Sequence, residues 1–271
     1  MKRSSPNHAT SWFEVKRPIV CLAPMDGVTN SAYRQIVRSL SKDVILFSEF
    51  TSVDGLVRSE HVRLRLDYEP CEHPFFMQLF GNSPEIFAEA SRMVEERGIW
   101  GVDINMGCPA KKIVHSQHGS ALMQNPDAAC RIVEEIRKAC SLEVSVKTRL
   151  GWKDEKNLIT FAKALESAGA SMLTIHGRTY NQAFKGESDW QPIYELKRHL
   201  TIPVIGNGDI RSGQLFGVAA VPRDPLDGGF VPLVVNFVPA GAADRGVGIV
   251  VDFALIDDGN VFIQQADQAA N

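Results

Sequence analysis

Four side chains in this sequence are of types that could do chemistry together: the thiol of Cys108, the cationic groups of Lys147 and Arg149, and the imidazole of His176. Cationic groups around an apolar cavity suit a ligand with a phosphate and a planar ring on which negative charge accumulates. A cysteine alone indicates little, because a buried free cysteine is commonly just a small hydrophobic residue. The role of Cys108 therefore depends on whether the fold brings these residues together.

Cys108 occurs in the stretch "GVDINMGCPAKK", which starts as a buried strand at residue 101 and ends in a turn. Gly107 allows the chain to turn sharply, and Pro109 stiffens it beyond the cysteine. Asn105 lies at the end of the same strand. Two cationic residues follow the turn, either as a solvated pair in a loop or as contacts to phosphate: Lys111 and Lys112.

Other kinds of site are not indicated. The sequence has no GxGxxG after its first strand and no GxxxxGK[ST], so it predicts neither a Rossmann dinucleotide site nor a P-loop. It has no HExxH motif and no clustered metal ligands, and no metal is expected. The five cysteines are scattered and form no CxxC, which argues against a disulfide framework and fits a reducing compartment. Four histidines are isolated and are expected to be surface or structural residues: His73, His115, His118 and His199.

The elements that must position these residues are short apolar strands, each followed by a helical pattern. In the helix after residue 82, Ser83 is a capping residue, Pro84 occupies the first turn and Gly98 ends the helix. Near-continuous apolar strands that alternate with helices are typical of a parallel sheet covered on both faces. Seven such units predict an α/β protein with a TIM (β/α)8-type barrel, whose eighth unit is not recognisable. The predicted strands span residues 18–25, 44–50, 74–81, 101–107, 143–151, 171–177 and 202–210.

Polar residues gather at the C-terminal ends of these strands, where the active sites of such barrels lie. In "VSVKTRL", Ser145, Lys147 and Arg149 share one face of the strand, because side chains alternate along a strand. His176 and Arg178 share a face of the next strand in the same way. If the aliphatic faces meet the outer helices, four basic side chains point into the mouth of the barrel.

The bulk properties are those of an ordinary soluble globular protein, with 271 residues and a hydrophobic fraction of 44%. A net charge of −3 gives no overall attraction to nucleic acid, so a local basic patch would have to meet such a partner. The N-terminus has no apolar core, and no later run approaches the ~20 apolar residues of a membrane span. We therefore expect a cytoplasmic protein without a membrane partner, and a monomer.

Eight stretches, in order and at consistent spacing between about residues 18 and 212, resemble the tRNA-dihydrouridine synthases. These are flavin enzymes on a TIM barrel that reduce a uridine of tRNA to dihydrouridine. "NMGCPAKK" and "HGRT" together are specific to the resemblance, whereas "APM" or "GNG" alone would be weak. The stretches are "APMDGVTNSAYR", "MQLFG", "DINMGCPAKK", "GSALM", "VKTRLGW", "LTIHGRT", "SDW" and "PVIGNGDI".

The resemblance implies FMN as the cofactor, NADPH as the electron donor and tRNA as the partner. Cys108 matches the family's general acid, which would give a proton to C5 of uracil while a hydride from the flavin goes to C6. A thiol with a pKa of about 8.5 is largely protonated at neutral pH and suits that role. The implied FMN contacts are Pro24, Met25, Gln78, Lys147, His176, Asn207 and Gly208. The implied substrate contacts are Asn105, Arg149, Arg178, Lys111 and Lys112.

The resemblance is lost after about residue 214. We therefore expect an FMN-binding TIM-barrel catalytic domain over 1–214 and an atypical apolar and acidic tail over 215–271. The tail contains no Lys or Glu, and two arginines against seven aspartates give it a formal charge of −5. This break is expected of a frameshifted or chimeric gene end, or of a divergent replacement for the family's helical tRNA-binding domain.

Two parts of the tail carry structural predictions. Either "PLVVNFV" or "GIVVDFALI" is expected to fill the gap left in the seven-stranded barrel, with low local order around 215–230, because unpaired strand edges are unfavourable. "GIVVDFALI" and "VFIQQ" around the turn "DDGN" also predict a β-hairpin.

Three functional interpretations stay open on the sequence. The first is reduction of uridine to 5,6-dihydrouridine in tRNA. The second is a non-catalytic or impaired barrel fragment derived from such an enzyme, which the foreign tail favours. The third is an FMN barrel oxidoreductase that acts on a small pyrimidine.

Overall fold

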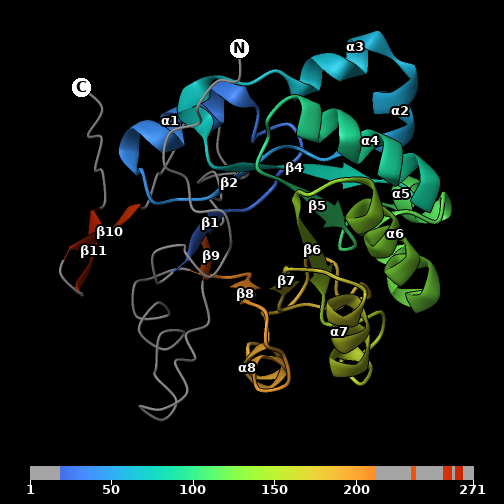
Figure 1. Cartoon of the computed structure of the whole chain (residues 1–271). Helices are drawn as coiled ribbons and strands as arrows, with labels where there is room; N and C mark the ends of the chain where they lie inside the picture. The colour runs from blue at the N-terminus through green and yellow to red at the C-terminus, as the bar shows by residue number, and fades with distance from the viewer. Residues whose placement is uncertain (1–18, 211–232, 236–252, 258–259, 265–271) are drawn as a thin grey trace.

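The computed structural model describes residues 19–210 and the backbone of three further strands at 233–235, 253–257 and 260–264 (Figure 1). Its main feature is a parallel sheet with the strand order β1-β9-β8-β7-β6-β5-β4-β2, in which β3 also pairs with β4. A parallel bridge between Cys21 and Ile45 brings β1 beside β2 and closes the circle. The predicted TIM-type barrel is thereby confirmed.

The seven predicted strands are all present, with one short extra strand, β3. Helices follow them on the outside of the sheet (Figure 1). The strands of the barrel are β1 (Val20–Leu22), β2 (Leu46–Phe47), β3 (Thr51–Ser52), β4 (Phe75–Phe80), β5 (Gly101–Asn105), β6 (Glu143–Arg149), β7 (Met172–His176), β8 (Val204–Asn207) and β9 (Leu233–Val235). The helices are α1 (Ser31–Leu40), α2 (Val53–Arg58), α3 (Glu60–Arg63), α4 (Pro84–Glu96), α5 (Lys111–His115), α6 (Pro126–Ala139), α7 (Leu158–Ser167) and α8 (Gln191–Lys197). Short 3-10 turns occur at η1 (Leu64–Leu66), η2 (Pro70–Glu72) and η3 (Gly119–Gln124).

The eighth position of the barrel is occupied by β9, which belongs to the stretch "PLVVNFV". Its residues 233–235 pair in parallel with all of β1, and Leu233 also pairs with Gly206 of β8. The prediction that one of two apolar tail segments fills the gap is therefore confirmed for this segment. "GIVVDFALI" instead contributes β10 (Phe253–Asp257), which pairs antiparallel with β11 (Asn260–Gln264) as the predicted hairpin. The prediction for 215–230 lies outside the described residues.

Helix α4 shows how closely local sequence signals set the boundaries. The hydroxyl of Ser83 accepts a hydrogen bond from the amide of Ile86 at 3.3 Å, and Pro84 occupies the first turn. Gly98 adopts a φ of +74°, which ends the helix at little steric cost. The helix buries Phe87 and Val94 against the sheet. The predicted start and end of this helix are confirmed.

The core has two layers that alternate along each strand. Phe76 belongs to a cluster inside the barrel with Cys21, Phe47 and Ile205, whereas the flanking residues of β4 belong to the larger cluster between sheet and helices. The same alternation puts Val144 and Val146 of β6 in the outer layer. Gln78, Ser145 and Lys147 therefore lie on the inner side of their strands, as the alternation predicts.

Candidate functional site

The register of the strands brings the predicted site residues to one end of the barrel. Asn105 of β5 lies opposite Lys147 of β6, and Arg149 lies opposite His176 of β7. His176 lies in turn opposite Asn207 of β8. Residues from four consecutive strands therefore meet at the C-terminal edge, where parallel barrels hold their active sites.

The turn that carries Cys108 is held by one amide side chain. Asn105 Oδ1 accepts hydrogen bonds from the backbone amides of Gly107 at 3.2 Å and Cys108 at 2.9 Å. Asn105 Nδ2 donates to Gln78 Oε1 at 3.0 Å across the strands. Two predicted ligand contacts, Gln78 and Asn105, thus fix the backbone that presents the thiol.

Asp103 completes this network, although the sequence analysis did not select it. Its fully buried carboxylate accepts hydrogen bonds from Gln78 Nε2 and Ser145 Oγ, both at 2.6 Å. Burial raises the pKa of Asp103 to about 6, against the opposing effects of its two hydrogen bonds and the charge of Lys147. A signal was present in the sequence, because a carboxylate within the apolar strand "GVDIN" has no reason to be there unless it has partners.

Lys147 is a half-buried cation beside this network. Its Nζ donates to Asn207 Oδ1 at 3.0 Å. Burial and the nearby Arg149 lower the pKa of Lys147 to about 8, while Asp103 and Cys108 oppose that shift. The ammonium group is therefore charged at neutral pH and loses its proton at a lower pH than an ordinary lysine.

His176 is neutral in this environment. Burial lowers its pKa to about 2, and the charges of Lys147, Arg149 and Arg178 act in the same direction. The charges of three other basic side chains thus act on His176, which agrees with the prediction that four basic side chains converge on the mouth of the barrel.

Two buried polar atoms at the ends of β7 and β8 have no hydrogen-bond partner among the described residues: His176 Nδ1 and Asn207 Nδ2. An unsatisfied buried polar group costs about 1–3 kcal/mol. Next to them, Gly208 adopts a φ of +113°, and a Cβ there would collide with Ser188 Oγ and lie 3.3 Å from His176 Nε2. This tight, incompletely bonded corner fits a polar ligand that supplies the absent partners.

The two arginines organise the loops around the mouth. The Arg149 guanidinium donates to the carbonyl oxygens of Gly107 at 2.7 Å, Thr179 at 3.2 Å and Ala183 at 2.9 Å. None of these bonds uses its Nη2. Arg178 forms a 2.6 Å ion pair with Asp209, a partner that the sequence analysis missed. Contact of either arginine with a substrate stays a prediction.

The remaining predicted residues lie at the rim. Pro24 and Met25 follow β1 and are partly exposed, while Lys111 and Lys112 are exposed in the first turn of α5. The exposure of the two lysines is compatible with a solvated pair and with contacts to phosphate.

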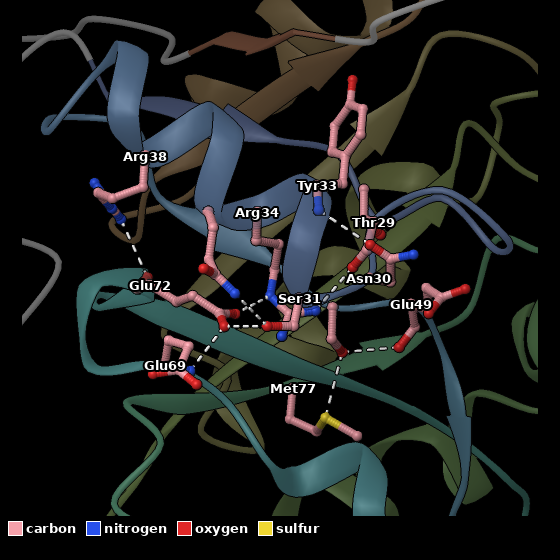
Figure 2. Close-up of polar contacts among 12 residues, drawn as sticks. Thr29, Asn30, Ser31, Tyr33, Arg34, Arg38, Glu49, Glu69, Glu72 and Met77 are labelled. Carbon is pink, nitrogen blue, oxygen red and sulfur yellow. Dashed lines mark hydrogen bonds and ion pairs between the residues drawn. The ribbon is translucent and has the colours of Figure 1, made fainter.

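The loop after β1 is braced from two sides by carboxylates, Glu49 and Glu72, whose contacts the sequence analysis did not predict. Glu49 Oε1 accepts the amide of Gly27 at 2.7 Å, and Thr29 exchanges hydrogen bonds with the backbone of Met25. Arg34 Nη1 donates to the carbonyl oxygen of Thr29 at 2.8 Å. Figure 2 shows the Arg34 side chain converging with that of Ser31 on Glu72.

Glu72 is the anchor of this brace. Its carboxylate accepts hydrogen bonds from Arg34 Nε at 2.6 Å, Ser31 Oγ at 2.5 Å and the Glu69 amide at 2.8 Å. The Glu72 side chain is 0% exposed and that of Arg34 is 4% exposed. A buried ion pair between η2 and α1 therefore fixes the loop that carries Met25.

Neither a metal-ion site nor a membrane-spanning helix is found in the part of the chain that the structure describes. Over that part, no three residues of the types His, Cys, Asp and Glu form a group that could hold a metal ion. Among the described helices, none is long and apolar enough to cross a membrane.

Solved structures share the fold of this chain. An old yellow enzyme homologue from Zymomonas mobilis superimposes with a TM-score of 0.56 at 13% identity, covering 80% of this chain and 84% of that one. A histamine dehydrogenase from a Rhizobium species gives a TM-score of 0.58 at 11% identity, covering 80% of this chain and 43% of that one. At such low identity the likeness concerns the fold alone.

Sequence relatives are more informative. A "probable tRNA-dihydrouridine synthase 1" of Synechocystis is 40% identical over 210 residues, which are 77% of this chain and 59% of that protein. The "tRNA-dihydrouridine synthase B" of Pseudomonas aeruginosa is 38% identical over 192 residues, which are 70% of this chain and 58% of that protein. The chain thus spans less than two thirds of the length of these relatives. The family model for dihydrouridine synthase matches residues 21–216. The chain belongs to the dihydrouridine synthase family.

Proposed function

We propose that this chain reduces uridine to 5,6-dihydrouridine in tRNA, with FMN as cofactor and NADPH as electron donor. The observation that carries the proposal is the cluster at the C-terminal edge of the barrel in which Lys147, His176 and Asn207 lie beside the turn that presents Cys108. The tRNA-dihydrouridine synthases among its relatives give the proposal its substrate.

The residues present fit FMN. The two unpartnered atoms, His176 Nδ1 and Asn207 Nδ2, are available to a ligand rich in hydrogen-bonding groups. Lys147 supplies a positive charge inside an apolar barrel, which suits a ring that becomes anionic when reduced. When bound, FMN supplies the hydride for the reaction. Its contacts would be Pro24, Met25, Gln78, Lys147, His176, Asn207 and Gly208.

Reduction of the uracil C5–C6 bond adds a hydride at C6 and a proton at C5. Cys108 holds that proton on its Sγ, and Asn105 fixes the thiol by binding the backbone amides of the turn. Arg149 Nε donates to the carbonyl oxygen of Gly107 at 2.7 Å, which places a positive charge beside the turn that carries Cys108.

The uridine must leave the RNA stack to reach this half-buried thiol at the mouth of the barrel, at a cost of a few kcal/mol. Arg149, Arg178, Lys111 and Lys112 surround the mouth of the barrel and would contact the extruded nucleotide and its phosphates. NADPH would use the same cavity before the RNA enters, because residues 1–214 carry no separate dinucleotide-binding motif.

A second interpretation is favoured by the tail. With a formal charge of −5, residues 215–271 would repel RNA. In that case the barrel binds flavin but turns over tRNA poorly or not at all. A barrel that reduces a small pyrimidine is the third alternative, and it needs no RNA contacts.

One experiment separates these functions. The purified chain, supplied with FMN and NADPH, is incubated with unmodified tRNA or with free uracil, and the products are analysed by mass spectrometry. Dihydrouridine in tRNA supports the proposal. Flavin binding without any product indicates an impaired barrel, and dihydrouracil alone indicates a small-molecule reductase.

A further inference from the structure

The carboxylate of Asp103 contacts residues of the proposed site but is not itself accounted for by the proposed function. It lies inside the barrel on β5, is 0% exposed, and accepts hydrogen bonds from Gln78 and Ser145. Burying a carboxylate is unfavourable even when it is paired, and an apolar residue of similar size would pack at lower cost. A structural role alone therefore does not explain why a charge is present there.

The charge gives a direction to a chain of hydrogen bonds. A carboxylate only accepts hydrogen bonds, so Gln78 must turn its Nε2 towards Asp103. The Gln78 Oε1 then faces Asn105 and accepts from its Nδ2. As a result, Asn105 Oδ1 is left to accept from the amides of Gly107 and Cys108. The Asp103 carboxylate thus fixes the orientation of the Gln78 amide, and the backbone amides of Gly107 and Cys108 favour the matching orientation of Asn105 at the other end of the chain of hydrogen bonds.

We propose that Asp103 is a positioning residue of the site: it sets the amide orientation of Gln78 and, through Asn105, the turn that presents Cys108. The inference rests on the proposed function, in which Gln78 contacts FMN and Cys108 donates the proton.

Asp103 also balances the charges that face it. Lys147 lies nearby on β6, and its ammonium charge and the Asp103 carboxylate act on each other. Without the carboxylate, the positive charges of Lys147 and Arg149 would be less compensated. An anionic reduced flavin would then be stabilised more than the neutral oxidised form, and the reduction potential would rise.

The test uses three variants of the full chain. Asp103→Ala removes the acceptor and releases Gln78. Asp103→Asn removes the charge but can keep an acceptor oxygen towards Gln78. Ser145→Ala is the matched control, because it removes the other hydrogen bond to the same carboxylate and leaves the Gln78–Asn105 chain untouched.

Three quantities are measured. The first is the rate at which iodoacetamide alkylates Cys108 in the flavin-free chain, followed by peptide mass spectrometry that separates this cysteine from the other four. The second is the FMN dissociation constant from fluorescence titration. The third is the midpoint potential of bound FMN from equilibration with reference dyes.

We expect Asp103→Ala to speed alkylation of Cys108 about 5-fold or more and to weaken FMN binding about 10-fold, as the loss of a charge-assisted hydrogen bond would. For Asp103→Asn, the alkylation rate and the FMN dissociation constant should stay within about 3-fold of the parent values, because the new amide can still offer an acceptor oxygen to Gln78. The midpoint potential of this variant should shift to a more positive value, because the negative charge is lost. Ser145→Ala should behave like the parent in all three.

Alkylation and FMN binding in a folded Asp103→Ala chain that equal those of Ser145→Ala would overturn the inference. If Asp103→Ala does not fold, an unchanged midpoint potential in Asp103→Asn overturns it. A parent chain that binds no FMN contradicts the proposed function instead, and alkylation of the flavin-free chain then decides the role of Asp103 by itself.

Discussion

Removing the carboxylate of Glu72 should be one of the most destabilising single changes in the barrel, because it leaves the Arg34 guanidinium buried without its counter-charge. The pair is separated by 2.6 Å, with side chains that are 0% and 4% exposed. Breaking a buried ion pair by removing one partner costs about 3–5 kcal/mol. For a chain of this size that corresponds to a fall in Tm of about 6–20 °C.

The assay is urea and thermal unfolding of the Glu72→Ala chain, followed by circular dichroism. Asp67→Ala is the matched control, because Asp67 forms a 2.7 Å pair with Arg97 in which both side chains are about half exposed. Such a surface pair is worth about 0–1 kcal/mol. Glu72→Gln, which keeps the shape but loses the charge, should fall between the two.

The same variant also tests the link from this pair to the site. Arg34 donates to Thr29, which in turn bonds the backbone of Met25, so loss of Glu72 should weaken FMN binding as well as stability. A Glu72→Ala chain whose unfolding free energy lies within 1 kcal/mol of the Asp67→Ala chain would refute the reasoning from burial. Equal FMN affinity in the two chains would refute the proposed link to the Met25 loop.

The other predictions concern the reaction itself. Cys108→Ala should retain FMN and its reduction by NADPH but slow uridine reduction by about 10²–10⁴-fold in single-turnover assays, and an unchanged rate would remove Cys108 from the mechanism. Lys147→Met should lower the reduction potential of bound FMN and weaken its retention, whereas a variant that titrates like the parent would mean that Lys147 does not face the flavin. Because the pKa of Lys147 is lowered to about 8 and that of Asp103 is raised to about 6, both groups are ionised only between these values. The rate of uridine reduction should therefore decrease when the pH rises above about 8, because Lys147 loses its charge. It should also decrease when the pH drops below about 6, because Asp103 gains a proton. A rate that is constant across pH ~5–9 would contradict this prediction. Filter-binding should give a tRNA affinity near the non-specific range of about 10⁻⁴–10⁻⁶ M because of the acidic tail, and submicromolar binding would show that residues 215–271 do not prevent tRNA binding.

The strands and much of the site could be predicted from the sequence because their signals are local. Apolar runs predicted the seven strands, and alternation along "VSVKTRL" placed Lys147 on the inner face of β6. The capping residue Ser83 and the stop at Gly98 set the limits of α4. Each of these features depends on residues that are close together in the chain.

The contacts that stabilise and orient the site join residues far apart in sequence, and local patterns do not reveal them. The Arg34–Glu72 pair spans 38 residues and the Arg178–Asp209 pair spans 31. Asp103 was visible as a polar residue in an apolar strand, but its partners on β4 and β6 depend on strand register. The choice of "PLVVNFV" over "GIVVDFALI" as the eighth strand likewise depended on pairing with β1 and β8 rather than on composition.

The most direct test of the central claim is the mass of tRNA uridines after incubation of the full chain with FMN, NADPH and unmodified tRNA, with the Cys108→Ala chain run beside it. We expect the parent to add one hydride and one proton to a uridine, and the variant to form this product far more slowly while still oxidising NADPH. A parent chain that retains FMN and oxidises NADPH yet leaves every uridine unchanged would contradict it.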